Sequence, residues 1–260
     1  GVEEYVGDYV TEAIAIYNDV RTLRNMQLQW GAEEWRHGVA WELVLKHSEA
    51  RTEAELEAYF AQVRDHHWSI KDHAGADTPL GVAAYAMVQE RATYFNYQEM
   101  RARIRREYGL PLKATTEERQ RGCEVGASEA FRVVGVDEIA HHGIFLKIVQ
   151  SHKRYFPSQT FEVLMTVFRG FEMPSLKIVP NRRQFLRATR RTDYYANSDH
   201  HRQHVENPVL RSLGLENDEA FEKAIQLARK LPENLGPDSV TLSHQGEWVI
   251  GYSSEMAPVG

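Results

Sequence analysis

Two short motifs in the sequence place a carboxylate and an imidazole three residues apart. Glu34 and His37 form the first pair, and Glu138 and His141 form the second. Residues with this spacing share one face of an α-helix. Around the second pair that face is otherwise apolar, with Phe131, Val134, Phe145 and Ile148 at helical spacing. A buried carboxylate needs a partner that offsets its loss of water. Either motif alone is also typical of a helix with a structural core histidine.

Two further acids lie on apolar helix faces between and before these motifs. Glu12 lies in a helix expected over residues 3–20, and Glu90 lies in one expected over 80–108. Ferritin-like di-iron or di-manganese bundles use one Glu from each of two helices and a Glu-x-x-His pair from each of the other two. Four carboxylates neutralise two divalent ions, and two imidazoles complete the ligand set. The order of these six residues therefore predicts a two-metal site. Glu12 is its weakest member, because the chain between it and Glu34 leaves only short arms for a helical hairpin.

Polar residues beside the motifs are candidates for supporting roles. Asp137 is expected to hydrogen-bond a ligand imidazole and to fix its tautomer. Arg36 is assigned a supporting role inside the first motif. Glu33 is one residue out of register with the ligand pair, and we interpret it as either solvated or bonded to a ligand.

Start and stop signals divide the rest of the chain into helices. A second helix is expected over 26–47, and Thr52 with Glu55 forms a capping box that opens a third. Thr78 and Pro79 open the helix over 80–108. The helix that carries Glu138 is expected to begin at about Glu117 or Gly126 and to end at about His152.

The fold class predicted from these helices is all-α. We expect a ferritin-like four-helix bundle with additional helices over residues 1–231, followed by a C-terminal extension over 232–260. The extension changes to a β-rich composition and is expected to form a hairpin or a tail.

Composition excludes several classes of protein. The chain has 260 residues, 42% of them hydrophobic and 26% charged, which is typical of a soluble globular protein. A net charge of −6 argues against nucleic-acid binding. Cys123 is the single cysteine, so a disulfide framework and a Cys-rich metal site are excluded. No stretch is long and apolar enough for a membrane span, and a cytoplasmic protein is expected.

Three stretches of the sequence resemble motifs of one enzyme family. They are AEEWRHG (32–38), QERATYF (89–95) and DEIAHH (137–142). These are similar to the EENRHG, QERATF and DEKRHE motifs of the soluble acyl-acyl-carrier-protein desaturases. A looser similarity, in YYANSDHHRQHVENPVLRSLG, extends the resemblance to cover about residues 10–215. That family inserts a cis double bond into a fatty-acyl chain carried on acyl carrier protein.

The resemblance implies a cofactor, partners and residue roles. It implies two iron ions (Fe²⁺), an acyl-carrier-protein substrate, a ferredoxin-like electron donor and a homodimer. The implied iron ligands are Glu12, Glu34, His37, Glu90, Glu138 and His141. Thr93 matches a threonine associated with oxygen activation, and Trp30 matches a tryptophan associated with electron or proton delivery. Ala140 replaces the arginine that the family usually has in its second motif.

An apolar channel beside the bundle would hold the acyl chain. The candidate lining residues are Met87, Tyr94, Val134, Gly135 and Phe145, although each of them is also typical of an ordinary core. An acidic carrier protein could dock on arginines 183, 187, 190 and 191, or on arginines 101, 103, 105 and 106. Either run is also typical of a solvated helix face.

Two other functions agree with the same ligands. One is a di-iron hydroxylase or N-oxygenase that acts on another carrier-bound or free substrate. The other is a non-enzymatic, ferritin-like iron-binding protein, which would have no long apolar tunnel.

Overall fold

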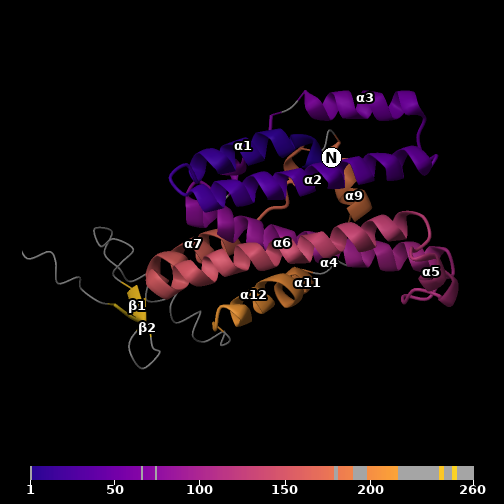
Figure 1. Cartoon of the computed structure of the whole chain (residues 1–260). Coiled ribbons are helices and arrows are strands. Elements are labelled where there is room, and N and C mark those ends of the chain that lie inside the picture. The colour runs from indigo at the N-terminus through magenta and orange to yellow at the C-terminus, as the bar shows by residue number, and fades with distance from the viewer. Residues whose placement is uncertain are drawn as a thin grey trace, which may run out of the picture.

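Four long helices lie side by side in the computed structural model, which describes residues 2–65, 67–73, 75–178, 181–189, 198–215, 240–242 and 248–250. They are α1 (Val6–Ile16), α2 (Arg21–His47), α4 (Pro79–Glu107) and α6 (Ala127–Tyr155). In Figure 1, α1 and α2 form one pair and α4 and α6 form the other. Helices make up most of the described residues, which confirms the predicted helical class.

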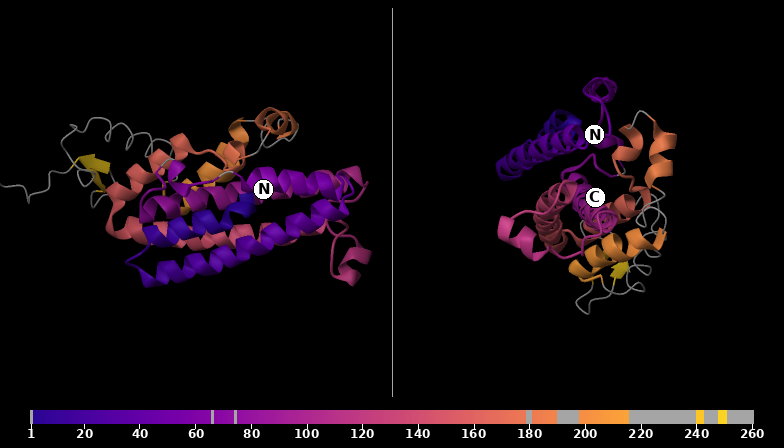
Figure 2. Two further views of the ribbon diagram at one scale, coloured as in Figure 1. Left: turned by 90° about the horizontal axis from the view of Figure 1, so that it is seen from above. Right: turned by 90° about the vertical axis from the view of Figure 1, so that its right-hand side faces the viewer.

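Further elements surround these four helices. Figures 1 and 2 show α3 outside α2, α5 at the turn between α4 and α6, and α11 and α12 on the opposite side of the α4–α6 pair. The N-terminal and central short elements are η1 (Val2–Tyr5), α3 (Glu53–Arg64), η2 (Ile70–Asp72) and α5 (Thr116–Arg121). The later elements are α7 (Pro157–Gly170), α8 (Ser175–Ile178), α9 (Arg182–Thr189), α11 (Ser198–His201), the π-helical turn η3 (Arg202–Glu206) and α12 (Asn207–Ser212).

Local sequence signals determine where the helices begin. The capping box that opens α3 is formed, because Thr52 Oγ1 accepts a hydrogen bond from the Glu55 backbone and Glu55 Oε2 accepts one from the Thr52 backbone. At the start of α4, Thr78 Oγ1 accepts a 3.0 Å hydrogen bond from the Gly81 backbone, ahead of Pro79. Of the two starts considered for α6, the structure has the one at Gly126, whose φ of +52° suits glycine.

A glycine brings α1 close to α2. A Cβ atom at Gly31 would lie 2.6 Å from Cγ2 of Val10, so a larger residue there would push the two helices apart. Glycine weakens a helix on its own, by about 1 kcal/mol relative to alanine. Here the glycine allows α1 to pack closely against the face of α2 that carries Gly31.

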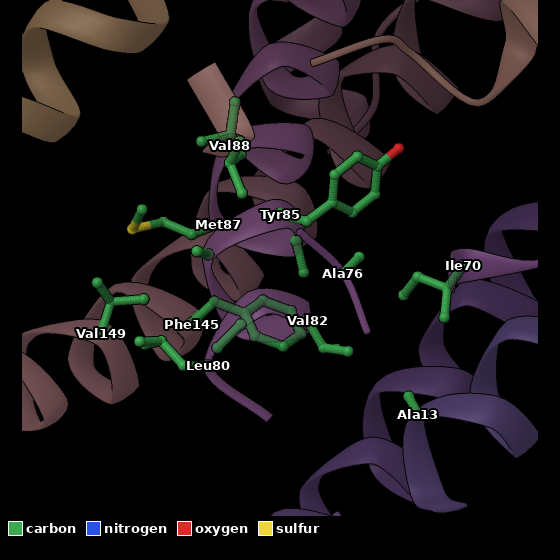
Figure 3. Close-up of a cluster of buried hydrophobic side chains, with 14 of the residues drawn as sticks. Ala13, Ile70, Ala76, Leu80, Val82, Tyr85, Met87, Val88, Phe145 and Val149 are labelled. Carbon is green, nitrogen blue, oxygen red and sulfur yellow. The ribbon is translucent and has the colours of Figure 1, made fainter. Parts of the chain in front are cut away.

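The hydrophobic core lies between the helix pairs. Figure 3 shows Val82 and Met87 of α4 beside Phe145 of α6, with Ala13 of α1 and Ile70 of η2 on the other side. All five are almost completely buried. The long helices are therefore held in register by continuous packing at the level where the polar residues described below enter the core.

The C-terminal part of the chain contains a short antiparallel pair of strands. β1 (Val240–Leu242) pairs with β2 (Trp248–Ile250), and Thr241 lies opposite Val249. The residues that join the two strands lie outside the described residues, so the expected hairpin stays a prediction. The predicted division at residues 231 and 232 lies outside the described residues. Within the described part of the chain, every helix is too short or too polar to cross a membrane.

Candidate metal centre

Five of the six predicted metal ligands converge in the buried interior. Glu34 and His37 come from α2, Glu90 comes from α4, and Glu138 and His141 come from α6. All five are buried, and Glu90 is 0% exposed. Glu34, Glu90, Glu138 and His141 each offer a ligand atom within 4.8 Å of the others. Three helices thus bring two widely separated motifs and one isolated acid to a single point.

The ligand atoms are close to one another without being hydrogen-bonded. Nδ1 of His141 lies 3.1 Å from Glu34 Oε1 and 3.5 Å from Glu90 Oε2. Nδ1 of His37 lies 3.5 Å from the same Glu34 oxygen and 3.5 Å from Glu138 Oε1. Glu34 Oε1, His37 Nδ1, Glu90 Oε2 and His141 Nδ1 are all buried and lack a hydrogen-bond partner. Buried polar atoms are rarely left in this state.

A divalent metal fits this donor set. Imidazole nitrogen and carboxylate oxygen are ligands that iron and manganese accept, and the described donors include no sulfur. Glu34 Oε1 lies between the two imidazoles, so this carboxylate is central to the group. Metal ions would satisfy the unpaired atoms and would neutralise the acids that burial otherwise forces together.

The outer nitrogen of each imidazole is held by a carboxylate from the other motif. His37 Nε2 lies 3.2 Å from Asp137 Oδ2, and His141 Nε2 lies 2.7 Å from Glu33 Oε2. The acid that precedes each motif therefore reaches across the α2–α6 contact to the histidine of the other motif. A proton on each Nε2 leaves each Nδ1 lone pair directed into the cluster, which is the tautomer a metal ligand requires.

Electrostatics in the cluster are strongly perturbed. Burial is the largest single influence and would lower the histidine pKa values, but the surrounding carboxylates, Glu34 foremost, together outweigh it and raise the pKa of His37 and of His141 to about 9. Burial, and then the charge of Glu34, raise the pKa of Glu90 and of Glu138 well above the usual value. Without metal, protons therefore occupy groups that metal ions would otherwise neutralise.

Trp30 and Thr93 adjoin the ligands. The Trp30 indole donates a 3.1 Å hydrogen bond from Nε1 to Glu90 Oε1. Thr93 lies one turn after Glu90 on α4, and its buried hydroxyl has no hydrogen-bond partner. Both side chains line the cavity described below.

Glu12 does not join the cluster. Its carboxylate accepts hydrogen bonds from the hydroxyl of Ser69, at 2.9 Å, and from the backbone of Ile70, at 2.8 Å. The inward face of α1 is formed by Tyr9 and Ala13, which are both buried. One residue corresponds to about 100° of helix rotation. The geometry therefore corrects the assignment of Glu12 as the sixth ligand: it caps η2 instead.

A cavity of about 670 Å³ adjoins the ligands on the side of α2 and α4. Its wall includes Glu34, Glu138 and Thr93 at the cluster, and Met100 and Arg103 farther along α4. Most of its lining is hydrophobic. Trp41, Val44, Leu45, Tyr97 and Phe131 form the part between the cluster and the end of α4.

None of the five predicted channel residues lines this cavity. Met87, Val134 and Phe145 are packed in the core, and Phe145 stacks edge-on against Trp30 at 5.5 Å. Gly135 is closely surrounded by side chains of α4, among them Tyr94. The five candidates come from α4 and α6, and the contact between these two helices is tightly filled, whereas the cavity is lined mainly from α2 and the other face of α4.

Some residues around the site have roles that the sequence did not reveal. Arg36, expected to support the site, is 66% exposed at its side chain and reaches only Glu33, at 3.6 Å. His142 is buried, and its Nδ1 donates to the backbone oxygen of Met87 at 2.8 Å. Tyr9 faces the cluster although its neighbours in the sequence carry no motif. In the sequence, only its spacing of four residues from Ala13 indicates that Tyr9 lies on the inward face of the helix.

Comparison of the sequence with protein-family models and with curated proteins gives no match. Inference about function therefore depends on the chemistry and geometry of this site.

Proposed function

We propose that this protein is an oxygen-dependent di-iron desaturase that inserts a cis double bond into a fatty-acyl chain carried on acyl carrier protein. The observation that carries the proposal is a buried set of three glutamates and two histidines, with unpaired ligand atoms, beside a largely apolar cavity. The arrangement of α1, α2, α4 and α6 supports a ferritin-like bundle as its scaffold.

The protein residues would hold the metal in a fixed, dry environment. Glu34, Glu90, Glu138, His37 and His141 are the proposed ligands, and Asp137 and Glu33 orient the imidazoles. Two bound iron ions would supply the chemistry of dioxygen reduction and removal of hydrogen from an unactivated methylene. A ferredoxin-like donor is the proposed source of electrons.

The cavity has the form that an extended alkyl chain needs. Its lining residues on α4 are Gln89, Thr93, Asn96, Tyr97, Met100 and Arg103, which follow one helix face. The fourteen residue steps from Gln89 to Arg103 correspond to about 21 Å of helix. An acyl chain lying along this face would pass Glu34 and Glu138 and would exclude water from them.

Thr93 and Trp30 are proposed to assist at the cluster. The Thr93 hydroxyl has no hydrogen-bond partner among the described residues and borders the cavity, so its Oγ1 is available to hold or donate a proton beside Glu90. The Trp30 indole fixes the orientation of the Glu90 carboxylate through its hydrogen bond.

α9 is the proposed docking site for the acidic carrier protein. Arg183 and Arg187 on α9 are exposed, and Phe185 between them lines the cavity. The alternative run on α4 is unsuitable as a whole, because Arg105 is fully buried in ion pairs and Arg101 is paired with Glu124. Arginines 190 and 191 lie outside the described residues.

A homodimer is proposed to form through the outer faces of α2 and α6. Large apolar side chains are exposed there at helical spacing, and Trp35 is 64% exposed. The others are Leu28, Val39 and Leu43 on α2 and Val133, Val136 and Ile144 on α6. Exposed apolar patches of this kind commonly mark interfaces. Light scattering of the wild type and of Trp35→Glu measures the oligomeric state, and a monomeric wild type would contradict the proposed homodimer.

The size of the cavity argues against simple iron storage, which needs no apolar space beside the ligands. A hydroxylase or N-oxygenase would keep the same ligands and cavity. The two oxygenases differ in product, so product identity separates them.

The test combines iron content with product analysis. Protein loaded anaerobically with Fe²⁺ is incubated with acyl-acyl-carrier-protein, a ferredoxin-based reducing system and oxygen, and the acyl chains are analysed by mass spectrometry. We expect about two irons per chain and an unsaturated product. Glu138→Ala should lose both, whereas Glu42→Ala, which removes a partly exposed acid of α2 paired with Lys46, should lose neither. Less than one iron per chain, or wild-type turnover in Glu138→Ala, would overturn the assignment.

A further inference from the structure

A series of aromatic rings leads away from the metal centre through α1. Trp30, which is hydrogen-bonded to Glu90, has its ring 5.2 Å from that of Tyr9. The Tyr9 ring lies 5.3 Å from the ring of Trp68, edge to face. All three side chains are buried. A continuous path of ring contacts therefore connects a proposed ligand with the segment that follows α3.

The far end of this path is attached to a base. The Trp68 indole donates a 3.1 Å hydrogen bond from Nε1 to Nε2 of His73, which is buried and has its ring 4.6 Å from the tilted ring of Tyr85. An Nε2 atom that accepts a hydrogen bond carries no proton, so it can take one. The indole at the near end likewise donates to a carboxylate, Glu90. Both tryptophans thus have an acceptor for the indole proton within hydrogen-bond distance.

Packing accounts for only part of this arrangement. Aromatic rings commonly fill cores, and a buried indole N–H usually finds a partner. Packing alone does not require that the rings form an unbroken path from a metal ligand, or that the partner at each end be a proton acceptor. Indole is among the most easily oxidised side chains, and loss of its N–H proton makes that oxidation easier.

We propose that Trp30, Tyr9, Trp68 and His73 form a relay that supplies an electron to the metal centre when it becomes oxidising and no substrate is present. This inference rests on the proposed function. Trp30 and Trp68 are the residues that are oxidised, and the Tyr9 ring bridges them. His73 acts through Trp68 and is a positioning residue and proton acceptor.

The step balances in electrons and protons. One electron passes from the Trp68 indole, through Tyr9 and Trp30, to the oxidised metal centre, which is reduced by one electron. The Trp68 N–H bond breaks and its proton goes to Nε2 of His73, which leaves a neutral indole radical and an imidazolium. A small one-electron reductant of the ascorbate class restores Trp68, and His73 returns the proton.

The chemistry of the rings sets the direction of transfer. Indole and phenol rings lose an electron at potentials that an oxygen-activating metal centre can reach, but they do not accept one from a ferredoxin-like donor. The relay is therefore a protective path for an oxidising centre and does not deliver the electrons of the normal reaction.

The test uses iron-loaded protein mixed with oxygen in the absence of substrate and freeze-quenched for electron paramagnetic resonance. We expect an organic radical signal whose width changes when tryptophan is replaced by ring-deuterated tryptophan.

Trp68→Phe should reduce this signal several-fold, and peptide mass spectrometry should show oxidation at Trp30 increasing. His73→Gln should reduce the signal too. Trp35→Phe, which removes an exposed tryptophan on the outer face of α2, should change neither readout.

Iron content and oxygen consumption are measured on every variant, so that failure of the relay is distinct from failure of the proposed function. If all variants bind iron and consume oxygen, and the radical is unchanged in Trp68→Phe or insensitive to labelled tryptophan, the relay is wrong and the proposed function stands. If the wild type takes up no iron, both are wrong. An equal effect of Trp35→Phe would also overturn the relay.

Discussion

Two clusters of buried charged side chains lie along the α4–α6 pair, and they differ in how completely their atoms are paired. The ion-pair cluster consists of Arg105, Glu118 and Glu124, where α4, α5 and the start of α6 meet. Both Glu118 oxygens accept bonds from the Arg105 guanidinium at 2.9 Å. The remaining Arg105 donors reach backbone oxygens of Pro111 and Lys113 and the Glu124 carboxylate. The metal centre, in contrast, leaves four buried ligand atoms unpaired.

This difference separates structural burial of charge from a functional site. A buried charge is tolerated when every donor and acceptor has a partner, and the ion-pair cluster meets that condition. Its role is to fasten the turn between α4 and α6. The candidate metal centre is equally buried, but four of its ligand atoms have no hydrogen-bond partner among the described residues, which is the state expected of a site that a metal ion completes.

The largest effect is expected from removing the cation of the ion-pair cluster. Arg105→Met leaves the Glu118 and Glu124 carboxylates buried without a counter-charge, which is strongly destabilising. We expect the melting temperature to fall by on the order of 10 °C in thermal unfolding followed by circular dichroism. Arg103→Met is the matched control, because Arg103 is partly exposed and pairs only with Glu107. Equal losses in the two variants would show that the cluster is not structural.

A smaller effect is expected from the residues that orient the imidazoles. Asp137→Asn keeps the shape of the side chain but removes the charge that holds the proton on His37 Nε2. Loss of such a partner typically weakens metal binding 10- to 100-fold. Anaerobic iron titration of the variant measures this. Arg36→Ala, which changes an exposed neighbour of Glu33, should leave the affinity unchanged. A wild-type affinity in Asp137→Asn would remove the support for a metal-ligand role of His37.

The pH dependence of stability should distinguish the two clusters further. Hydrogen bonds from Arg105 and from Thr115 hold the pKa of Glu118 well below its usual range. A depressed pKa in the folded state contributes stability above the unfolded-state pKa of about 4.3, and that stability is lost as the pH falls below it. Urea unfolding between pH 7 and pH 3 should therefore show a steeper loss in the wild type than in Glu118→Gln. Parallel curves would contradict the assignment.

Much of the metal centre could be predicted from the sequence because helical spacing is a strong constraint. Glu34 with His37, and Glu138 with His141, are each placed on one face by the 3.6-residue period, whatever the tertiary structure. Glu90 follows from the same argument on α4. The caps at Thr52 and Thr78 also formed as expected, since each depends on residues only three positions apart.

Features that depend on the packing between helices could not be predicted in this way. The position of Glu12 depends on the rotation of α1 against α2, which the contact between Gly31 and Val10 helps to fix. The location of the cavity depends on which helix pair packs tightly, and apolar residues on α4 face both sides. The crossed bonds of Glu33 and Asp137 likewise require the register of α2 against α6, which periodicity does not determine.

The smallest expected effect is a change in the free energy of unfolding of the metal-free protein. Its sign should differ between the two clusters. Glu138→Gln keeps the shape of a carboxyl group whose pKa burial raises well above the usual value, so that the group is already protonated in the metal-free protein. We expect the free energy of unfolding without metal to stay the same or rise by up to about 1 kcal/mol, because a neutral amide replaces a neutral acid and the energy needed to protonate that acid on folding is no longer required. Glu118→Gln, the matched change in the ion-pair cluster, should lower it, because that carboxylate accepts from Arg105 and from two backbone groups. Urea unfolding in the presence of a chelator measures both. A loss in Glu138→Gln as large as that in Glu118→Gln would mean that the buried acids of the metal centre stabilise the fold by themselves.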